Sequence, residues 1–171
     1  MKLQIGSSSV RGRYRRRPWI NMDLFKCDDV NVRGDGCYLP FADSSFDEVH
    51  CIHVLEHMPR DKYSIVLKEK FRVLEPGGSV FVEVPDLIAT AQRLVKAYGD
   101  RDYSLVHNCV TSIYGKSDIP GMGHQCGFYE GLLLRAFREQ GFNDVTRLTK
   151  IDDMISTHYK QEPVLLIRGT K

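Results

Sequence analysis

One stretch, residues 39–86, constrains the fold of this chain more than any other. Residues 46–52 (FDEVHCI) are rich in β-formers and follow an Asp-Ser-Ser turn, which predicts a strand. Residues 60–74 carry apolar side chains at helical spacing, and the Pro-Gly-Gly run behind them predicts a helix end before a second alternating strand at 79–84. A strand, a helix and a strand within 48 residues predict a parallel strand pair with a right-handed crossover.

Length and charge indicate one globular unit with a local basic segment. A chain of 171 residues with 42% hydrophobic residues has room for one substantial core, so we expect a single domain over 1–171. The formal net charge is +2, and five of the 24 basic residues are arginines within 11–17. Such a cluster fits a site for phosphate or another polyanion, and it fits a solvated loop equally well.

The cysteines and the hydropathy pattern exclude several classes of protein. Five scattered cysteines form no C-x-x-C pair, so we expect reduced thiols, no disulfide framework and no metal site. No window of ~18 apolar residues occurs, so we expect neither a signal peptide nor a membrane span, and hence a cytoplasmic protein. The sequence leaves the oligomeric state open.

Two further strands are predicted near the amino terminus. Residues 2–5 (KLQI) lead into Gly6, and residues 19–23 (WINMD) end on Asp23. Ligands of open α/β sheets bind beyond the carboxyl ends of parallel strands, so both residues should face one crevice. Gly6 would let a backbone approach a ligand closely, and the Asp23 carboxylate could accept hydrogen bonds from a ribose diol.

The run LPFADSSFDEVHCIHVLEHM, followed by RVLEPGGSVFVEVPD, closely resembles the middle of class I S-adenosylmethionine-dependent methyltransferases, in their type 11-like branch. The resemblance implies an α/β fold: a three-layer Rossmann-like sandwich with a mostly parallel seven-stranded sheet whose last strand is antiparallel. It also implies S-adenosyl-L-methionine as the cofactor. Only residues 7–18 separate the first two strands, so the first crossover helix is expected to be shortened or absent.

The resemblance also assigns the cofactor residues. It places the reduced glycine turn beside the methionine part of the cofactor, Asp23 on the ribose and Asp35 on the adenine amino group. An Asp-Gly turn before a strand would account for Asp35 without a ligand. The full cofactor set is Gly6, Ser7, Ser8, Asp23, Asp35, Gly36, Cys37 and His53.

Three titratable residues, His53, Glu56 and His57, follow the strand at 46–52, where the family places the transferable methyl group. One of them could act as a general base, whereas a structural hydrogen-bonding role fits Glu56 and His57 as well. We predict His124, which lies among glycines, as the base, with His53 positioning the reactants. The residues predicted to bind substrate are Arg13, Arg15, Arg16, Arg17, His57 and Tyr103.

The rest of the chain divides into further helices and strands. An apolar stripe over 87–98 predicts a helix used for core packing, with Asp86 as its N-cap. Residues 100–127 show little periodicity, which favours a lid with a short helix around 103–113. Later segments predict a helix over 129–140 and strands at 145–149 and 164–168.

The favoured function is methyl transfer from S-adenosyl-L-methionine to a small or medium acceptor, a sugar or metabolite hydroxyl, with an anionic acceptor as one option. The first alternative is a degenerate domain that binds without catalysis. A nucleic-acid methyltransferase is a further alternative supported by the arginines alone, and we do not expect a nucleic-acid partner. A nicotinamide oxidoreductase is disfavoured because G-x-G-x-x-G does not follow the first strand.

Overall fold

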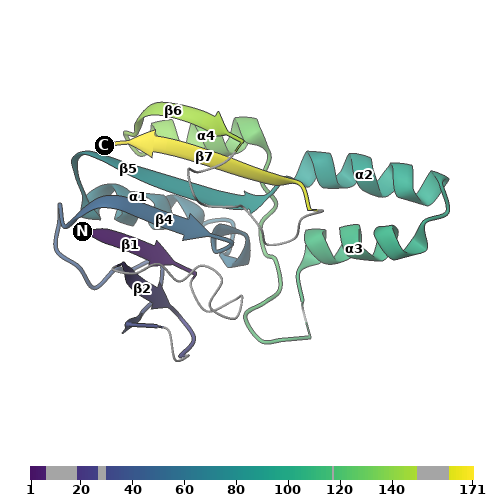
Figure 1. Ribbon diagram of the computed structural model, residues 1–171, viewed down its shortest axis with the longest axis horizontal. Helices are drawn as coiled ribbons and strands as arrows, with labels where there is room; N and C mark the ends of the chain where they lie inside the picture. Colours follow the sequence, from purple (N-terminus) through teal and green to yellow (C-terminus); the bar gives the residue numbers. More distant parts are fainter. Residues whose placement is uncertain (7–18, 27–29, 117, 150–161) are drawn as a thin grey trace.

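The structure is a computed structural model that describes residues 1–6, 19–26, 30–116, 118–149 and 162–171. Seven strands form one sheet in the order β3-β2-β1-β4-β5-β7-β6 (Figure 1). Strands β1 to β5 pair in parallel, whereas β7 is antiparallel to both of its neighbours. The strands are β1 (Lys2–Ile5), β2 (Ile20–Asp23), β3 (Val32–Arg33), β4 (Phe46–Ile52), β5 (Leu74–Pro85), β6 (Asn143–Leu148) and β7 (Val164–Thr170).

This sheet confirms the predicted α/β Rossmann-like class, with an antiparallel last strand. The predicted strand at 46–52 is β4, and α1 (Tyr63–Val73) is the crossover helix to β5. The helix ends earlier than expected because Leu74 is already extended and pairs with Phe46. The Pro-Gly-Gly run therefore belongs to β5, beside an irregularity in the register between β4 and β5. Residues 7–18, where a shortened helix is predicted, lie outside the described residues.

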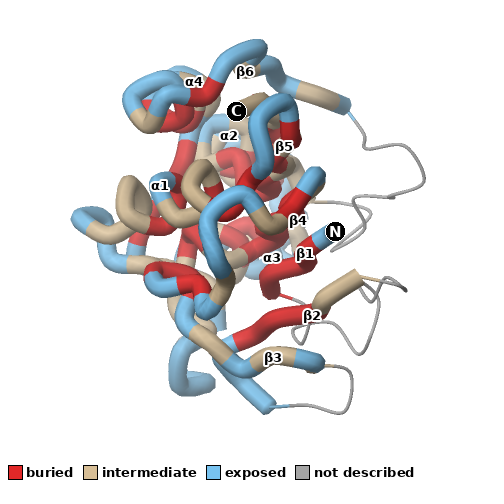
Figure 2. Tube along the Cα trace, turned by 90° about the vertical axis from the view of Figure 1, so that its left-hand side faces the viewer, coloured by how far each residue is buried: buried red, intermediate tan, exposed pale blue. Residues whose placement is uncertain are grey.

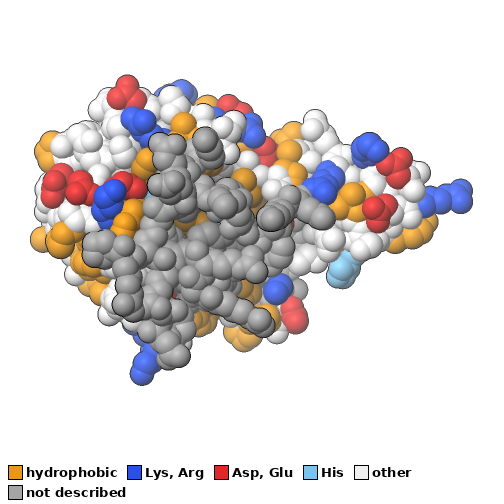
Figure 3. Space-filling view, in the orientation of Figure 1, with side chains coloured by type: hydrophobic (Ala, Val, Ile, Leu, Met, Phe, Trp, Pro, Cys, Tyr) orange, Lys and Arg blue, Asp and Glu red, His pale blue; other side chains and the backbone are white. Residues whose placement is uncertain are grey.

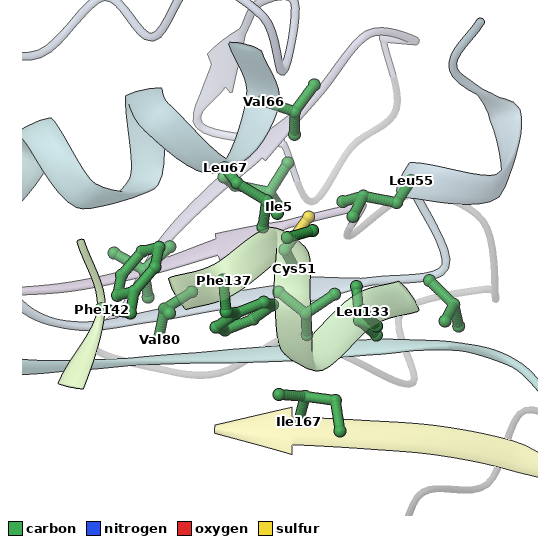
Figure 4. Close-up of a cluster of buried hydrophobic side chains, with 14 of the residues drawn as sticks. Ile5, Cys51, Leu55, Val66, Leu67, Val80, Leu133, Phe137, Phe142 and Ile167 are labelled. Atoms are coloured by element: carbon green, nitrogen blue, oxygen red, sulfur yellow. The ribbon is translucent and has the colours of Figure 1, made fainter. Parts of the chain in front are cut away.

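The core lies between the sheet and two helices, α1 and α4 (Glu130–Glu139). Buried segments of the strands face these helices in Figure 2. Figure 4 shows side chains of α4, such as Leu133 and Phe137, packed among residues of the strands, such as Cys51, Val80 and Ile167. Such interdigitated aliphatic and aromatic side chains contribute about 1.5–3 kcal/mol each on burial.

Two helices, α2 (Leu87–Gly99) and α3 (Tyr103–Tyr114), pair with each other and extend beyond the end of the sheet (Figure 1). Asp86 caps α2 as predicted, because its Oδ1 accepts from the amides of Ile88 and Ala89 at 3.1 Å. The prediction that the α2 stripe packs in the core is wrong: Val95 is 73% exposed, and Figure 3 shows apolar side chains on the projecting pair. A helix that leaves the sheet has too little surface against it to cover such a stripe.

The segment 100–127 is more regular than its sequence suggests. The short helix predicted around 103–113 is a full helix, α3, and the residues after it run back to the 3-10 helix η1 (Leu55–His57). None of the described helices combines the length and the apolar character that a membrane crossing requires.

Candidate functional site

The carboxyl ends of β1, β2 and β4 lie side by side, since Ile5 is in register with both Met22 and Cys51. Gly6 follows β1 with a φ of +82°, and its amide donates to the Met22 carbonyl at 3.1 Å. An added Cβ would lie 2.5 Å from the Ile52 carbonyl oxygen. The chain thus requires glycine here for its own packing, in addition to any approach of a ligand.

The two predicted ligand carboxylates lie on adjacent turns. Asp23 ends β2 and is buried, and its Oδ1 accepts from the Phe25 amide at 2.9 Å. The Asp23 carbonyl accepts from Gly34 at 3.0 Å, which joins this turn to the segment that carries Asp35. Asp35 is exposed, and its Oδ1 accepts from the Cys37 amide at 2.8 Å. The structure therefore brings Asp23 and Asp35 to one edge of the sheet, as the sequence predicts.

A buried lysine that sequence reasoning missed supports this edge. Lys70 of α1 is fully buried, and its Nζ donates to the Gly36 carbonyl at 2.8 Å. Burial lowers the pKa of Lys70 and raises the pKa of the nearby Cys37 thiol, which Asp35 raises further. Lys70 stands four residues after Val66 on the inner face of α1, and a cation in that stripe is a signal that could have identified it.

His53 lies beyond β4, between two carboxylates, with a φ of +50°. Its Nδ1 is 2.9 Å from Glu56 Oε1, and its Nε2 is 3.1 Å from Oε1 of Glu83, a buried residue of β5. Burial opposes a charged imidazole, but the hydrogen bond to Glu56 and the close contact with the Glu83 carboxylate outweigh it and raise the pKa of His53 to about 10. The ring is therefore an imidazolium at neutral pH, which fits positioning and does not fit a general base. The sequence missed Glu83.

His57 and His124 face each other across the same region. Their rings lie 4.9 Å apart with their planes at 72°. His57 Nδ1 is 3.2 Å from the Gly123 carbonyl, and the His124 amide donates to the Tyr114 carbonyl at 2.9 Å. Burial lowers the pKa of His124, so its side chain is neutral near pH 7. The structure thus brings together the three histidines that the sequence predicted.

Glu56 lies beside these rings and completes a group of potential metal ligands. One ligand atom each from Glu56, His57 and His124 lies within 4.8 Å of the other two. Burial tends to raise the pKa of the Glu56 carboxyl, but the hydrogen bond from His53 and the positive charge of its ring outweigh it, and this pKa is lowered.

A cavity of about 650 Å³ opens beyond the carboxyl ends of β4 and β5. It lies between η1, α2 and α3, and His53, His57 and His124 form part of its wall. Two cations also line it, Arg93 and Lys116, and neither forms a salt bridge with any residue that the structure describes. Sequence reasoning missed both. Arg93 lies on the opposite face of α2 from the apolar stripe, the face that carries the buried residues Thr90 and Ala97.

The remaining predicted residues lie elsewhere. Tyr103 does not line this cavity: it starts α3, is exposed, and packs edge-on against Tyr98 at 6.5 Å. Gly6, Asp23 and Asp35 are also outside the cavity wall, so the predicted cofactor edge and the cavity are neighbouring regions that meet at His53. The predictions that fall outside the described residues are Ser7, Ser8, Arg13, Arg15, Arg16 and Arg17.

Comparison with known proteins bears on this arrangement. A protein-family model described as a methyltransferase domain matches residues 9–82. A demethylmenaquinone methyltransferase of Staphylococcus aureus (strain MRSA252) is 31% identical over 129 residues, which are 75% of this chain and 48% of that protein. A solved SAM-dependent methyltransferase from Archaeoglobus fulgidus aligns over 99% of this chain and 85% of its own, with a TM-score of 0.64 and 19% identity. The matching domain model, the Staphylococcus relative and the shared fold together support a class I S-adenosylmethionine-dependent methyltransferase.

A second solved methyltransferase extends the fold comparison. It is the 1,6-didemethyltoxoflavin-N1-methyltransferase of Burkholderia thailandensis, with bound 1,6-didemethyltoxoflavin and S-adenosylhomocysteine. It is 16% identical, with a TM-score of 0.57, over 99% of this chain and 70% of its own. Identity at this level shows the shared methyltransferase fold alone. The chain spans about half the length of the curated demethylmenaquinone methyltransferases, or less.

Proposed function

We propose that this chain transfers a methyl group from S-adenosyl-L-methionine to a small or medium acceptor held in the cavity between η1, α2 and α3. The observation that carries the proposal is the meeting of two regions at His53. On one side lie the strand ends with Gly6, Asp23 and Asp35, and on the other lies a cavity lined by neutral and charged polar groups. Methyl transfer needs donor and acceptor to be held in line at short range, and two adjoining sites at a shared wall suit that requirement.

The residues at the first region fit the cofactor. The Asp23 carboxylate stands at the end of β2, where a ribose diol can donate to it, and the exposed Asp35 carboxylate stands on the adjacent turn. We assign Gly6, Ser7, Ser8, Asp23, Asp35, Gly36, Cys37 and His53 as the cofactor set. The S-adenosylhomocysteine bound to the Burkholderia methyltransferase supports this choice of cofactor. When bound, the cofactor supplies a methyl group on a sulfonium, which is an electrophile.

We assign His124 as the proton acceptor for a hydroxyl acceptor and His53 as a positioning residue. The neutral ring of His124 lines the cavity, whereas His53 is already protonated and held by two carboxylates. A general base of this kind contributes about 10²- to 10⁴-fold in rate. His124→Ala should lower turnover by that factor, keep its affinity for S-adenosylhomocysteine and keep its melting temperature. A stable variant with full activity would remove His124 from this role.

We infer that the acceptor carries an anionic group. Arg93 and Lys116 line the cavity without a carboxylate partner among the described residues, and two carboxylates, Glu56 and Glu162, share the wall. A cation beside a cavity is stabilised by an anionic ligand, and an arginine binds carboxylate or phosphate through two parallel hydrogen bonds. A metabolite or sugar hydroxyl that bears a carboxylate or a phosphate fits both the cations and His124.

Calorimetric titration with S-adenosylhomocysteine tests the proposal directly. Loss of a charged hydrogen bond costs ~1.5–3 kcal/mol, so Asp23→Asn should weaken binding by roughly 10- to 150-fold. Asp100→Asn is the matched control, because Asp100 is exposed at the end of α2 and pairs only with Lys96 among the described residues. Wild-type protein that binds no cofactor would support the degenerate, non-catalytic alternative. Equal affinities of the two variants would remove Asp23 from the cofactor set.

A further inference from the structure

We propose that Glu56, His57 and His124 bind one divalent transition-metal ion, of which Zn²⁺ is the type, in the wall of the acceptor cavity. One ligand atom from each residue lies within 4.8 Å of the other two. The inference rests on the proposed function in one respect, since the ion would meet the acceptor in this cavity. Metal binding itself requires neither cofactor nor acceptor.

Hydrogen bonds hold together the backbone segments that carry Glu56, His57 and His124. The Glu56 carbonyl accepts from the Gln125 amide at 2.7 Å, and the Gln125 side chain donates to the His57 carbonyl at 2.9 Å. A bridge between Gly115 and Gly123 holds the residue before His124 beside the end of α3. The two parts of the site therefore come from distant parts of the sequence but share one hydrogen-bonded frame.

The hydrogen bonds of His57 prepare it as a ligand. Because a carbonyl can only accept, the contact of 3.2 Å with the Gly123 carbonyl fixes the proton on Nδ1 of His57. The other nitrogen, Nε2, then carries the lone pair that a metal ion needs. Metal-bound histidines are held in this way, by a second hydrogen bond from the nitrogen that does not bind the ion.

The carboxylate of Glu56 has one oxygen engaged and one without a partner. Oε1 contacts His53 Nδ1 at 2.9 Å, whereas Oε2 is buried and makes no hydrogen bond to another described residue. A buried oxygen without a partner costs about 1–3 kcal/mol, and more when it is charged. A bound cation would satisfy this oxygen, and His53 would then act as the outer partner that orients the carboxylate.

Two imidazoles and one carboxylate are the ligand set of Zn²⁺ and related first-row ions. With bonds of ~2.0–2.2 Å, the ligand atoms of a tetrahedral ion stand roughly 3.3–3.6 Å apart. Ligand atoms within 4.8 Å need to close by at most ~1.5 Å, which side-chain rotation provides. Three protein ligands leave the fourth position open toward the cavity that His57 and His124 line.

An oxygen of the acceptor can occupy that open position. A bound cation favours the deprotonated form of a hydroxyl, whose proton is released to water. With the ion in place, His124 is a metal ligand and no longer accepts the proton of the acceptor hydroxyl. The ion then promotes deprotonation of that hydroxyl in its place. Such an ion would also attract the carboxylate or phosphate that Arg93 and Lys116 select.

The test is metal titration of tag-free protein that has been freed of metal with a chelator. Calorimetry with Zn²⁺ should show one ion per chain, and Co²⁺ should give the visible absorption of a four- or five-coordinate site with nitrogen and oxygen ligands. Loss of a residue that only orients a metal ligand weakens metal binding by about 10- to 100-fold. His57→Ala and His124→Ala each remove a ligand itself, so each should weaken Zn²⁺ binding by at least that factor. His107→Ala is the matched control, since His107 lines the same cavity outside the cluster. It should keep the wild-type affinity for Zn²⁺.

Melting curves with and without Zn²⁺ accompany the titration. Zn²⁺ should raise the melting temperature of wild-type protein and of His107→Ala, and should leave the two ligand variants unchanged. If an alanine variant fails to fold, His57→Gln or His124→Asn replaces it. Absence of saturable binding to folded wild-type protein would overturn the proposal. Zn²⁺ affinities of the ligand variants equal to that of the control would also overturn it. Loss of Zn²⁺ binding in Cys109→Ser alone would do the same, because Cys109 lines the same cavity outside the cluster.

A parallel titration with S-adenosylhomocysteine in the presence of chelator separates this inference from the proposed function. Cofactor binding without metal binding would leave the methyltransferase assignment standing and overturn the metal site. Metal binding without cofactor binding would support the metal site and overturn the methyltransferase assignment.

Discussion

Replacement of Gly6 by alanine tests the close packing at the carboxyl end of β1. Gly6 has a φ of +82°, and an added Cβ would lie 2.5 Å from the Ile52 carbonyl oxygen and 2.6 Å from Val54 Cγ2. The left-handed backbone costs a residue other than glycine about 1–2 kcal/mol. Displacing a packed backbone adds about 1–3 kcal/mol. The free energy of unfolding of Gly6→Ala should therefore fall by roughly 2–5 kcal/mol.

Gly77→Ala is the matched control for this change. Gly77 has a nearly identical φ of +81°, but no described residue beyond its chain neighbours lies within 4 Å of the Cβ that alanine would add. It should lose only the conformational part, about 1–2 kcal/mol. Urea unfolding followed by circular dichroism measures both variants, with the midpoint read at an unchanged slope. Equal losses in the two variants would refute the steric argument.

The same pair of variants separates folding from function. Gly6 lies at the proposed cofactor edge, whereas Gly77 lies at the start of β5, near the opposite end of the strands. Displacement of the Ile52 backbone would move the turn that leads to His53. Gly6→Ala should therefore weaken S-adenosylhomocysteine binding, measured on protein that is still folded, and Gly77→Ala should leave it unchanged.

Three further predictions follow from charged groups. A hydrogen bond from His50 lowers the pKa of Glu48 to about 2, so Glu48 should stabilise the fold above pH ~4.5 and lose that contribution as the pH falls toward 2. At neutral pH the free energy of unfolding of Glu48→Gln should be about 1–3 kcal/mol below that of the wild type, and this difference should shrink as the pH falls from ~4.5 toward 2. A difference that stays constant with pH would contradict the lowered pKa of Glu48. Arg72→Lys should cost about 1–3 kcal/mol in urea unfolding because it loses a two-pronged contact with a carboxylate, whereas the exposed Arg135→Lys should cost under ~0.5 kcal/mol. Arg93→Gln should raise the acceptor KM by roughly 10-fold or more with unchanged cofactor affinity, and an unchanged KM would remove Arg93 from acceptor binding.

The local pattern of the sequence determined much of the fold. The period of the apolar residues and the Pro-Gly-Gly run predicted β4, α1 and β5 in order, and the boundaries shifted by a few residues at the helix ends. The antiparallel last strand came from the family resemblance and is confirmed by the pairing of β5 with β7. These features are predictable because hydrophobic period and turn residues act over short distances along the chain.

The tertiary structure decided what depends on contacts between distant segments. The sequence predicted a role for His53, but only the approach of Glu56 and Glu83 makes it an imidazolium, since burial alone would favour the neutral ring. The extension of α2 beyond the sheet decided that its apolar stripe is largely exposed. The cluster of Glu56, His57 and His124 likewise exists because the segment after α3 returns to η1, and no short-range pattern records that return. Burial, charge and ligand geometry at this site are properties of the packed chain. The sequence therefore predicted which histidines lie at the site, whereas their protonation states depend on tertiary contacts.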